Sequence, residues 1–234
     1  KIEFFLKKFI YCNKLLKLVT IAKNNDDSFT QIFGSKSDAI IYNGRSMLIS
    51  TDVESVKKEI SNYKIDDRTI VITHVARFHP EKNQKLLIES FNQVVAEGFN
   101  AILLIIGNGY DSKEGKLLQE QACDKIYFLG LKKNVGDYLK NSDAFALSSL
   151  NEALACGCIP LSTPVSGSVD IIQNGKNGFL SKDFSVDSYI TMLKDFFKNH
   201  ENIDKKELEV YFENNLSMKK CAEKYYEFFK KCLK

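Results

Sequence analysis

The chain of 234 residues is long enough for one large domain, or for one domain and part of another. Its 44% hydrophobic and 27% charged residues are typical of globular proteins, and its net charge of +3 is too small to indicate nucleic-acid binding. No apolar run reaches the roughly 18 residues of a transmembrane helix, and the lysine-broken N-terminal segment does not resemble a signal peptide. The six cysteines fit no disulfide framework, so we expect buried, reduced thiols in a cytoplasmic protein.

The first part of the chain contains short elements. Residues 1–19 have the apolar spacing of a helix with lysines on its other faces, and such a helix either packs on a core or lies on an anionic membrane. We then expect a short strand at 18–22, a helix that ends at Gly34, a strand at 38–46 that runs into an Asn-Gly turn, and a helix that starts near Asp52.

From residue 69 onward, strands alternate with helices. The expected strands are 69–78, 101–109, 125–130, 143–150 and 158–163. The expected helices are 83–98, 114–123, 134–142, 151–157, 185–200 and those within 204–234, with a helical turn at 168–175 leading into a hairpin-like 176–180. The alternation predicts an α/β fold with a doubly wound parallel sheet, whose ligands bind beyond the carboxyl ends of the strands.

The first strand of this series ends at a pair of cations. Arg77, one of only three arginines in the chain, follows the strand, and Lys82 precedes the next helix. Two cations beside a helix N-terminus form an anion site that suits a diphosphate, because the free N–H groups and the helix dipole add to the side-chain charges. The alternative is that both are surface charges on a solvated loop.

Other strand ends carry further candidates. His74, inside the first strand of the series, is expected to be a core histidine rather than a base. Gly107 and Gly109 either allow close backbone approach to a ligand or form an ordinary turn. Glu152, in the first turn of its helix, either interacts with the helix dipole or accepts hydrogen bonds from the vicinal hydroxyls of a ribose. No residues have the spacing of a metal site, so we expect no metal ion.

Several stretches, in this order, resemble the family-4 (group 1) retaining glycosyltransferases of the GT-B fold over roughly residues 40–195. They are VARFHPEKNQKLLIESF, LLIIGNG, IYFLGLKKNVGDYLKNSDAFALSS, EALACGCIPLSTPVSG and NGKNGFL. The resemblance implies that residues 49–203 form the Rossmann-like, nucleotide-sugar-binding C-terminal domain. Residues 1–48 would be a remnant of an incomplete N-terminal acceptor domain with the interdomain linker, and residues 204–234 would be helices that cross back toward that domain.

The resemblance also implies roles for individual residues. Arg77 and Lys82 match the basic pair that holds the donor diphosphate, and they would neutralise the departing nucleotide without a metal ion. Glu152 matches the glutamate that binds the ribose hydroxyls, and the loop from Leu129 to Leu131 would lie near the nucleobase. The remaining donor-binding candidates are Gly107, Asn108, Gly130, Asn151 and Ser166.

The chain departs from the family pattern at Leu150, which directly precedes Asn151. The family places a first glutamate, a glycine and the donor-sugar loop at this point. Either these residues are deleted, or the chain as given omits them. We expect omission, because a deletion would force the strand straight into the helix and would empty the sugar pocket. Nearby, Asp170 stands where the family often has a glutamate, which is one methylene longer.

We therefore expect a metal-independent, retaining hexosyltransferase-type enzyme that moves a sugar from a UDP- or GDP-linked donor to a glycan or lipid-linked acceptor in surface polysaccharide biosynthesis. No cofactor is expected besides this nucleotide-sugar substrate, and no nucleic acid. Two alternatives stay open, a non-catalytic nucleotide-binding module and a GT-B-type sugar-nucleotide epimerase. The basic helices expected at 1–19 and 216–234 predict that the protein is cytoplasmic and can contact the inner face of the membrane peripherally.

Overall fold

The computed structural model describes residues 2–147 and 150–233, and the chain divides into two compact units. The first unit comprises Lys1–Ser46, Val165–Ile171 and Glu213–Lys234, and the second comprises Met47–Pro164 and Ile172–Phe212. The domain breaks expected from the sequence fall after residues 48 and 203. No helix in the described part of the chain combines the length and the apolar content that crossing a membrane requires.

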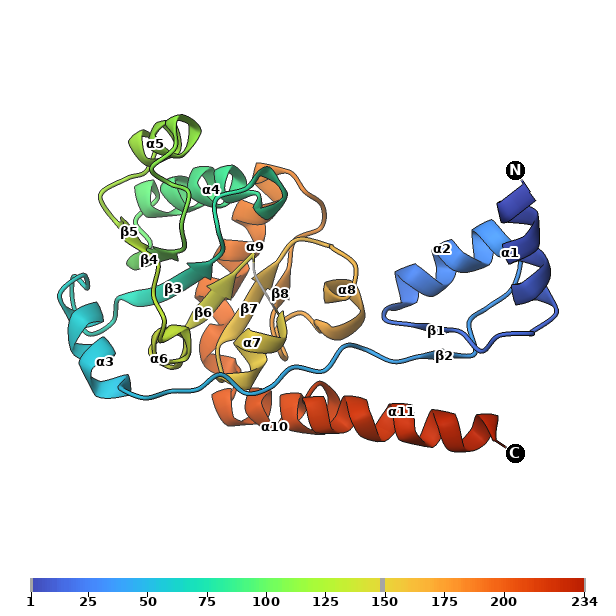
Figure 1. The fold of residues 1–234 in the computed structure, drawn as a ribbon. Coiled ribbons are helices and arrows are strands. Elements are labelled where there is room, and N and C mark those ends of the chain that lie inside the picture. The colour runs from blue at the N-terminus through green and yellow to red at the C-terminus, as the bar shows by residue number, and fades with distance from the viewer. Residues whose placement is uncertain (1, 148–149, 234) are drawn as a thin grey trace. The chain divides into compact units, whose positions relative to one another are not determined.

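The second unit is built on a parallel sheet of six strands in the order β5-β4-β3-β6-β7-β8 (Figure 1). The strands are β3 (Ile70–Val75), β4 (Ala101–Ile106), β5 (Ile126–Gly130), β6 (Ala144–Ala146), β7 (Ile159–Ser162) and β8 (Phe179–Leu180). Every residue of β4 is buried, as its unbroken apolar sequence predicts for a strand that is covered on both faces. The predicted fold class, a doubly wound parallel α/β sheet, is confirmed.

Helices cover both faces of this sheet. Figure 1 shows α3 (Val53–Ser61), α6 (Val135–Lys140) and α7 (Leu150–Ala155) on one side, and α4 (Gln84–Ala96) and α9 (Val186–Asn199) on the other. The remaining helices of the region are α5 (Lys113–Glu120), the 3-10 helices η1 (Pro80–Lys82) and η2 (His200–Asn202), and α10 (Lys205–Asn215). Three helices start where a side chain caps them: Asp52, Ser112 and Ser185 each accept a hydrogen bond from the backbone N–H three residues later.

The apolar core on the α3 and α6 side shows how the sequence specifies the packing. Val56 and Ile60 of α3 and Tyr138 of α6 pack against alternate residues of the central strands, which are Val71, Ile102, Leu104 and Ile106. Since alternate residues of a strand point to opposite faces, the intervening β4 residues are left for the other face, where α4 and α9 pack on each other.

The first unit contains a two-stranded parallel sheet, β1 (Val19–Thr20) and β2 (Ala39–Ile40), with four helices. The helices are α1 (Ile2–Cys12), α2 (Lys23–Phe33), α8 (Ser168–Ile171) and α11 (Met218–Cys232). Aromatic rings hold α1 to α2, with the rings of Phe4 and Tyr11 5.7 and 5.0 Å from that of Phe33. Neither α1 nor α11 has a buried residue.

Some expectations for single elements are wrong. The helix expected over 1–19 ends at Cys12, and Lys14 has a left-handed backbone with φ 51°. The Asn-Gly pair does not form a turn. Its glycine, Gly44, lies so close to α11 that an added Cβ would stand 2.6 Å from the Cβ of Cys221.

Two further corrections concern β8 and the cysteines. The segment expected to form a hairpin supplies β8, which pairs parallel with β7 as the edge strand of the sheet. All six cysteines are free thiols, as expected, but only Cys156 and Cys158 are buried, and Cys12 and Cys232 are exposed. Burial raises the pKa of Cys156 to about 11 and that of Cys158 well above its ordinary value. Ser148 and Ser149, expected at the end of a strand, lie outside the described residues.

Candidate active site

The strand order of the second unit puts a topological switch point between β3 and β6. The chain runs from β3 outward through β4 to β5, then returns to the other side of β3 and continues outward through β6, β7 and β8. At such a topological switch point the loops after the two central strands lead in opposite directions, which leaves room for a ligand at the carboxyl edge of the sheet. The loops after β3 and β6 are therefore the first place to look for a site.

The loop after β3 carries Arg77 and Lys82, whose side chains are both exposed. The backbone holds this loop in place: the N–H of Phe78 donates to the carbonyl of Asn108 at 2.8 Å, and the Gln84 side chain donates from Nε2 to the carbonyl of Arg77 at 3.0 Å. Lys82 ends η1, and Asn83 turns the chain into α4 with a left-handed φ of 50°. Both cations are thus carried by a well-anchored loop at the switch point.

The charges of this loop suit an anionic ligand. Among residues 2–147 and 150–233, neither Arg77 nor Lys82 has an ion-pair partner. Asn83 makes no side-chain cap to α4, so no side chain at this position competes for the amides of the first turn. Buried below the loop, His74 has its pKa lowered to about 4, mainly by burial and further by the positive charge of Lys82. It is a core histidine, and its neutral ring adds no charge to the site at neutral pH.

A cavity of about 440 Å³ lies beyond the carboxyl ends of β4 and β5. It brings together five of the residues singled out from the sequence, which are Gly107, Asn108, Gly109, Gly130 and Leu131. The other lining residues are Tyr110, Asp111, Lys116, Gln119 and Phe128. Aromatic rings and polar side chains in one hollow of this size can hold a flat heterocycle by stacking and by hydrogen bonds.

Two of the predicted residues have different surroundings from those expected. Gly107 lies against the backbone that follows the neighbouring strand β3, since an added Cβ there would stand 2.0 Å from the carbonyl oxygen of Ala76. Leu129 lies at a register shift between β4 and β5, and its side chain packs against the core under α3. Gly130 and Leu131 of this loop line the cavity, and Leu129 does not.

Tyr110 is the most buried residue of the cavity lining that the sequence analysis missed. It is 6% exposed, and its ring lies 5.2 Å from that of Phe128 in an edge-to-face contact. Within the described residues its hydroxyl has no hydrogen-bond partner, and burial raises its pKa to about 12. An aromatic residue directly after the glycine pair GNG was the available signal for it.

Glu152 and Asn151 lie in the first turn of α7, the helix that follows β6 along the chain, and both are half-buried. Because β6 neighbours β3, the strand order brings α7 and the Arg77 loop to the same edge of the sheet. Ser166 belongs to the first unit, where its hydroxyl donates to the Asn25 side chain at 3.1 Å. Asp170 likewise accepts a hydrogen bond from the N–H of Lys23 at 2.8 Å.

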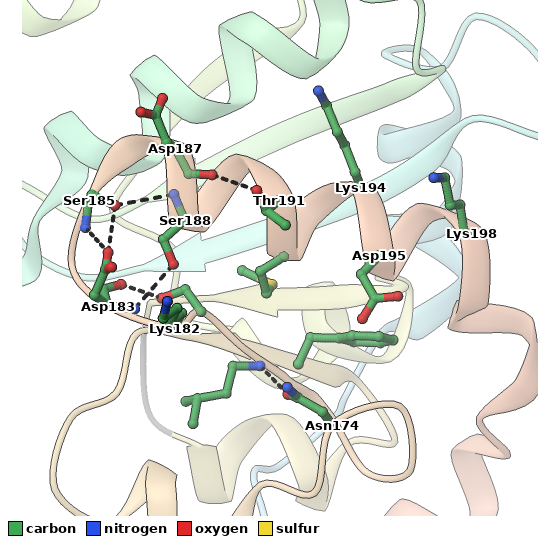
Figure 2. A pocket seen from close by; sticks show the side chains of 14 residues that line it. Asn174, Lys182, Asp183, Ser185, Asp187, Ser188, Thr191, Lys194, Asp195 and Lys198 are labelled. Carbon is green, nitrogen blue, oxygen red and sulfur yellow. Dashed lines mark hydrogen bonds between the residues drawn. The ribbon is translucent and has the colours of Figure 1, made fainter.

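A larger cavity of about 700 Å³ lies elsewhere, between β8 and α9 (Figure 2). Its polar side chains are mostly engaged within the chain: Ser185 donates to Asp183, and Thr191 donates to the carbonyl of Asp187 (Figure 2). Lys194 is paired with Glu97. The part of the chain that the structure describes also contains no group of three or more potential metal ligands. The cationic loop and the smaller cavity therefore remain the candidate site.

The strand order and the loops at the carboxyl edge define a Rossmann-like α/β unit of the GT-B type. Comparison with solved structures agrees with this fold. The Anabaena protein Alr3699/HepE, in complex with UDP and glucose, matches with a TM-score of 0.69 at 17% identity, over 92% of this chain and 63% of that one. The chain belongs to the family described as glycosyl transferases group 1, whose family model matches residues 55–217.

Two curated relatives are similar to the chain over part of their length. The N-acetyl-alpha-D-glucosaminyl L-malate synthase of Bacillus anthracis is 30% identical over 182 residues, which cover 72% of this chain and 46% of the relative. The capsular polysaccharide biosynthesis glycosyltransferase CapM of Staphylococcus aureus is 27% identical over 151 residues, which cover 56% of this chain and 39% of the relative. The chain thus spans less than half the length of these relatives.

Proposed function

We propose that this chain is the donor-binding part of a glycosyltransferase that moves a sugar from a nucleotide-diphosphate sugar to a glycan or lipid-linked acceptor, with retention of the anomeric configuration. One observation carries the proposal: two cations without ion-pair partners in the described residues stand at the switch point of a group 1 glycosyltransferase sheet. The names of the relatives support a role in surface polysaccharide or related glycan synthesis.

Arg77 and Lys82 would bind the diphosphate and act on the leaving group. Arginine offers two parallel hydrogen bonds to phosphate oxygens, and lysine a mobile point charge. As the bond from the sugar to the diphosphate breaks, negative charge grows on the phosphate oxygens, and fixed cations lower the energy of that state more than that of the intact donor. These two charges would stabilise the leaving diphosphate as a metal ion does in other enzymes. We therefore propose a metal-independent transfer whose rate is unchanged in excess EDTA.

The remaining groups would hold the nucleoside. Glu152, with Asn151 beside it in the first turn of α7, would accept hydrogen bonds from ribose hydroxyls, and the cavity at Asn108, Gly130 and Leu131 would hold the base. UDP or GDP is the nucleotide that we propose, and the UDP bound by the Anabaena protein supports the first.

The donor-sugar side of the site centres on the junction between Leu150 and Asn151. In the structure α7 begins at Leu150, and Leu147 just after β6 has a left-handed φ of 48°, which is unusual for leucine. We propose that loop residues belong between Leu150 and Asn151, a junction that lies inside α7 in the structure. The intact mass of the natural protein, or its gene sequence, tests it. A continuous junction would favour the alternative of a nucleotide-binding module without transferase activity.

We further propose that the protein is cytoplasmic and binds the membrane surface peripherally. Phe5 and Phe9 of α1 are 66% and 59% exposed, and α11 carries lysines beside exposed aromatic residues such as Phe229. Vesicles that contain anionic lipids should bind the protein in a salt-sensitive manner, and neutral vesicles should not. Equal binding to anionic and neutral vesicles, or no binding to either, would refute the proposed membrane contact.

Nucleotide titration tests the phosphate site. UDP and GDP are titrated by calorimetry into the full chain and into the double variant Arg77→Ala, Lys82→Ala. Loss of charge-assisted hydrogen bonds should cost about 1.5–3 kcal/mol of binding free energy for each cation. The matched control is Arg68→Ala with Lys85→Ala, since both control side chains are exposed on the same unit and pair only with surface carboxylates. Equal affinity of the parent chain and the Arg77 and Lys82 variant would refute the phosphate site.

A further inference from the structure

Three side chains form a hydrogen-bonded network next to the proposed base cavity. The Glu59 carboxylate of α3 accepts a hydrogen bond from the Tyr138 hydroxyl of α6 at 2.6 Å and from Lys132 Nζ at 3.1 Å. The Lys132 ammonium also lies 5.4 Å from the centroid of the Tyr138 ring. The side chains of Lys132 and Glu59 are 28% and 33% exposed, so this pair is more sheltered than an ordinary surface ion pair.

The network attaches to the rim of the cavity through the chain itself. Lys132 directly follows Gly130 and Leu131, which line the cavity. This rim has little packing of its own: Gly130 has a left-handed φ of 64° and no atom within 4 Å of an added Cβ, and Leu131 is 73% exposed. The backbone ties the rim to β4, because Gly130 pairs with Ile106 in the ladder and its carbonyl accepts a hydrogen bond from the N–H of Gly107 at 2.9 Å. On its other side, the nearest anchor is the Lys132 side chain.

The partners of Lys132 are themselves held firmly. The buried Asp137 carboxylate of α6 accepts hydrogen bonds from the backbone N–H groups of Thr51 and Asp52 at 3.0 and 3.1 Å. Asn141 donates from Nδ2 to the carbonyl of Val53 at 2.9 Å. Helices α3 and α6 therefore form a fixed base for the network, because these bonds join the start of one helix to the other.

The charge states favour the network at neutral pH. Burial alone would raise the pKa of Glu59, but hydrogen bonds from Tyr138 and Lys132 outweigh burial and hold that pKa below its ordinary value. Hydrogen bonding to Tyr138, and then to Glu59, raises the pKa of Lys132. Glu59 is thus an anion and Lys132 a cation across the physiological range, so the bond between them is charge-assisted.

We propose that Glu59, Lys132 and Tyr138 are positioning residues that hold the cavity rim and thereby set the affinity for the nucleoside of the donor, without acting on its diphosphate. This inference rests on the proposed function, since it takes the cavity at Gly130 and Leu131 as the base site. No member of the network lines the cavity, so each acts through the rim.

The test separates nucleoside binding from diphosphate binding. Calorimetry measures the affinity of the full chain for UDP, for GDP and for inorganic pyrophosphate, with the variants Glu59→Gln, Lys132→Met and Lys132→Arg. The first two should weaken binding of the preferred nucleotide about tenfold and leave pyrophosphate within twofold, because the network contacts only the rim. Lys132→Arg should restore most of the loss, since arginine can still reach the carboxylate.

A matched control comes from the opposite side of the sheet. Glu97 pairs with Lys194 at 2.6 Å, the two side chains are 33% and 36% exposed, and Gln93 supplies a third partner. Glu97→Gln removes an equivalent ion pair away from the rim and should leave all three affinities unchanged. Hydrogen exchange provides a second readout that needs no ligand: the amides of residues 130–132 should exchange faster in Glu59→Gln than in the parent chain or in Glu97→Gln.

The outcomes separate this inference from the proposed function. If the parent chain binds UDP or GDP and the network variants bind it equally well, the inference fails while the proposed function stands. Unchanged exchange at residues 130–132 in Glu59→Gln also overturns it. Parallel losses for nucleotide and pyrophosphate would show that the network supports the whole site and would refute its selective role. If the parent chain binds neither nucleotide, the proposed function fails and the inference falls with it.

Discussion

Acid should destabilise the second unit through His74. This residue is fully buried in β3, and its Nδ1 lies 2.8 Å from the carbonyl oxygen of Ala146, to which it donates in the neutral ring. Burial is the main cause that lowers its pKa from 6.5 to about 4, and the charge of Lys82 adds to it. Since the folded protein resists protonation of His74 and the unfolded chain does not, protons favour the unfolded state.

The size and the pH range of the effect follow from these two pKa values. The contribution of His74 to the free energy of unfolding is complete above its unfolded pKa of about 6.5. It falls as the pH drops below that value and is fully lost below about 4. At about 1.36 kcal/mol for each pH unit, the total loss amounts to about 3 kcal/mol, of which about 2 kcal/mol is lost by pH 5. Carboxylates with lowered pKa values, such as Glu59 and Glu97, lose their stabilising charge only as the pH falls below about 4.5.

The assay compares urea unfolding from pH 7.5 to pH 5, followed by circular dichroism because the chain has no tryptophan. The reference is His74→Asn, whose side-chain amide can still donate to the Ala146 carbonyl and does not titrate. This variant should be less stable at pH 7.5, because the smaller side chain leaves a cavity. Its stability should change by less than about 0.5 kcal/mol over the range, against about 2 kcal/mol for the parent chain. Equal slopes in the two proteins would refute the argument.

Three other substitutions test the anchoring of the site loops. Gly107→Ala should destabilise the second unit by about 3 kcal/mol or more in thermal melting, because the new Cβ meets a backbone carbonyl. Gly98→Ala, where φ is also positive but an added Cβ meets no atom within 4 Å, should cost about 1 kcal/mol. Asp137→Ala orphans two backbone N–H groups and should cost about 2–3 kcal/mol in urea unfolding; a cost below about 0.5 kcal/mol would contradict the role assigned to them. Gln84→Leu frees the carbonyl of Arg77 and should raise the Kd for UDP about fivefold, with an unchanged Kd as the contrary result.

Elements governed by local chemistry could be predicted from the sequence. The start of α3 follows from the Asp52 cap, which needs only the N–H of Ser55. The burial of β4 follows from its continuous run of apolar residues. In the first case the two partners are three residues apart, and in the second the amino-acid composition of the strand itself decides its burial.

Features governed by distant partners could not be predicted in the same way. Asn43-Gly44 carries a strong turn signal, but the chain forms no turn there and α11 approaches Gly44 closely. The partner atoms belong to Ser217, Met218 and Cys221, which lie far along the chain, and no local sequence pattern predicts this contact. A glycine therefore indicates either a turn or a close approach, and only the tertiary structure decides between them.

The candidate site also contains features that local sequence predicts and features that depend on distant partners. The position of Arg77 and Lys82 follows from a strand end and a helix start, and the strand order then brings α7 with Glu152 to that edge. At the cavity rim the sequence led to Leu129, Gly130 and Leu131. Gly130 and Leu131 line the cavity, whereas Leu129 lies at the register shift in β5 and its side chain packs against the core. Such a shift depends on pairing between strands, which side-chain type alone does not reveal.

The two halves of the proposed donor site thus depend on different parts of the chain. The diphosphate half is encoded within one short loop, from Arg77 to Gln84, whose anchors lie on the same segment or on the neighbouring β4. The nucleoside half depends on Glu59 and Lys132, which are 73 residues apart and belong to no common motif. Substitutions in α3 can therefore alter the choice of nucleoside while the cationic loop keeps its geometry, and substitutions in the loop weaken every diphosphate ligand alike. On this reasoning, the residues that set donor preference should be sought in α3 and α6 as well as among those that line the cavity.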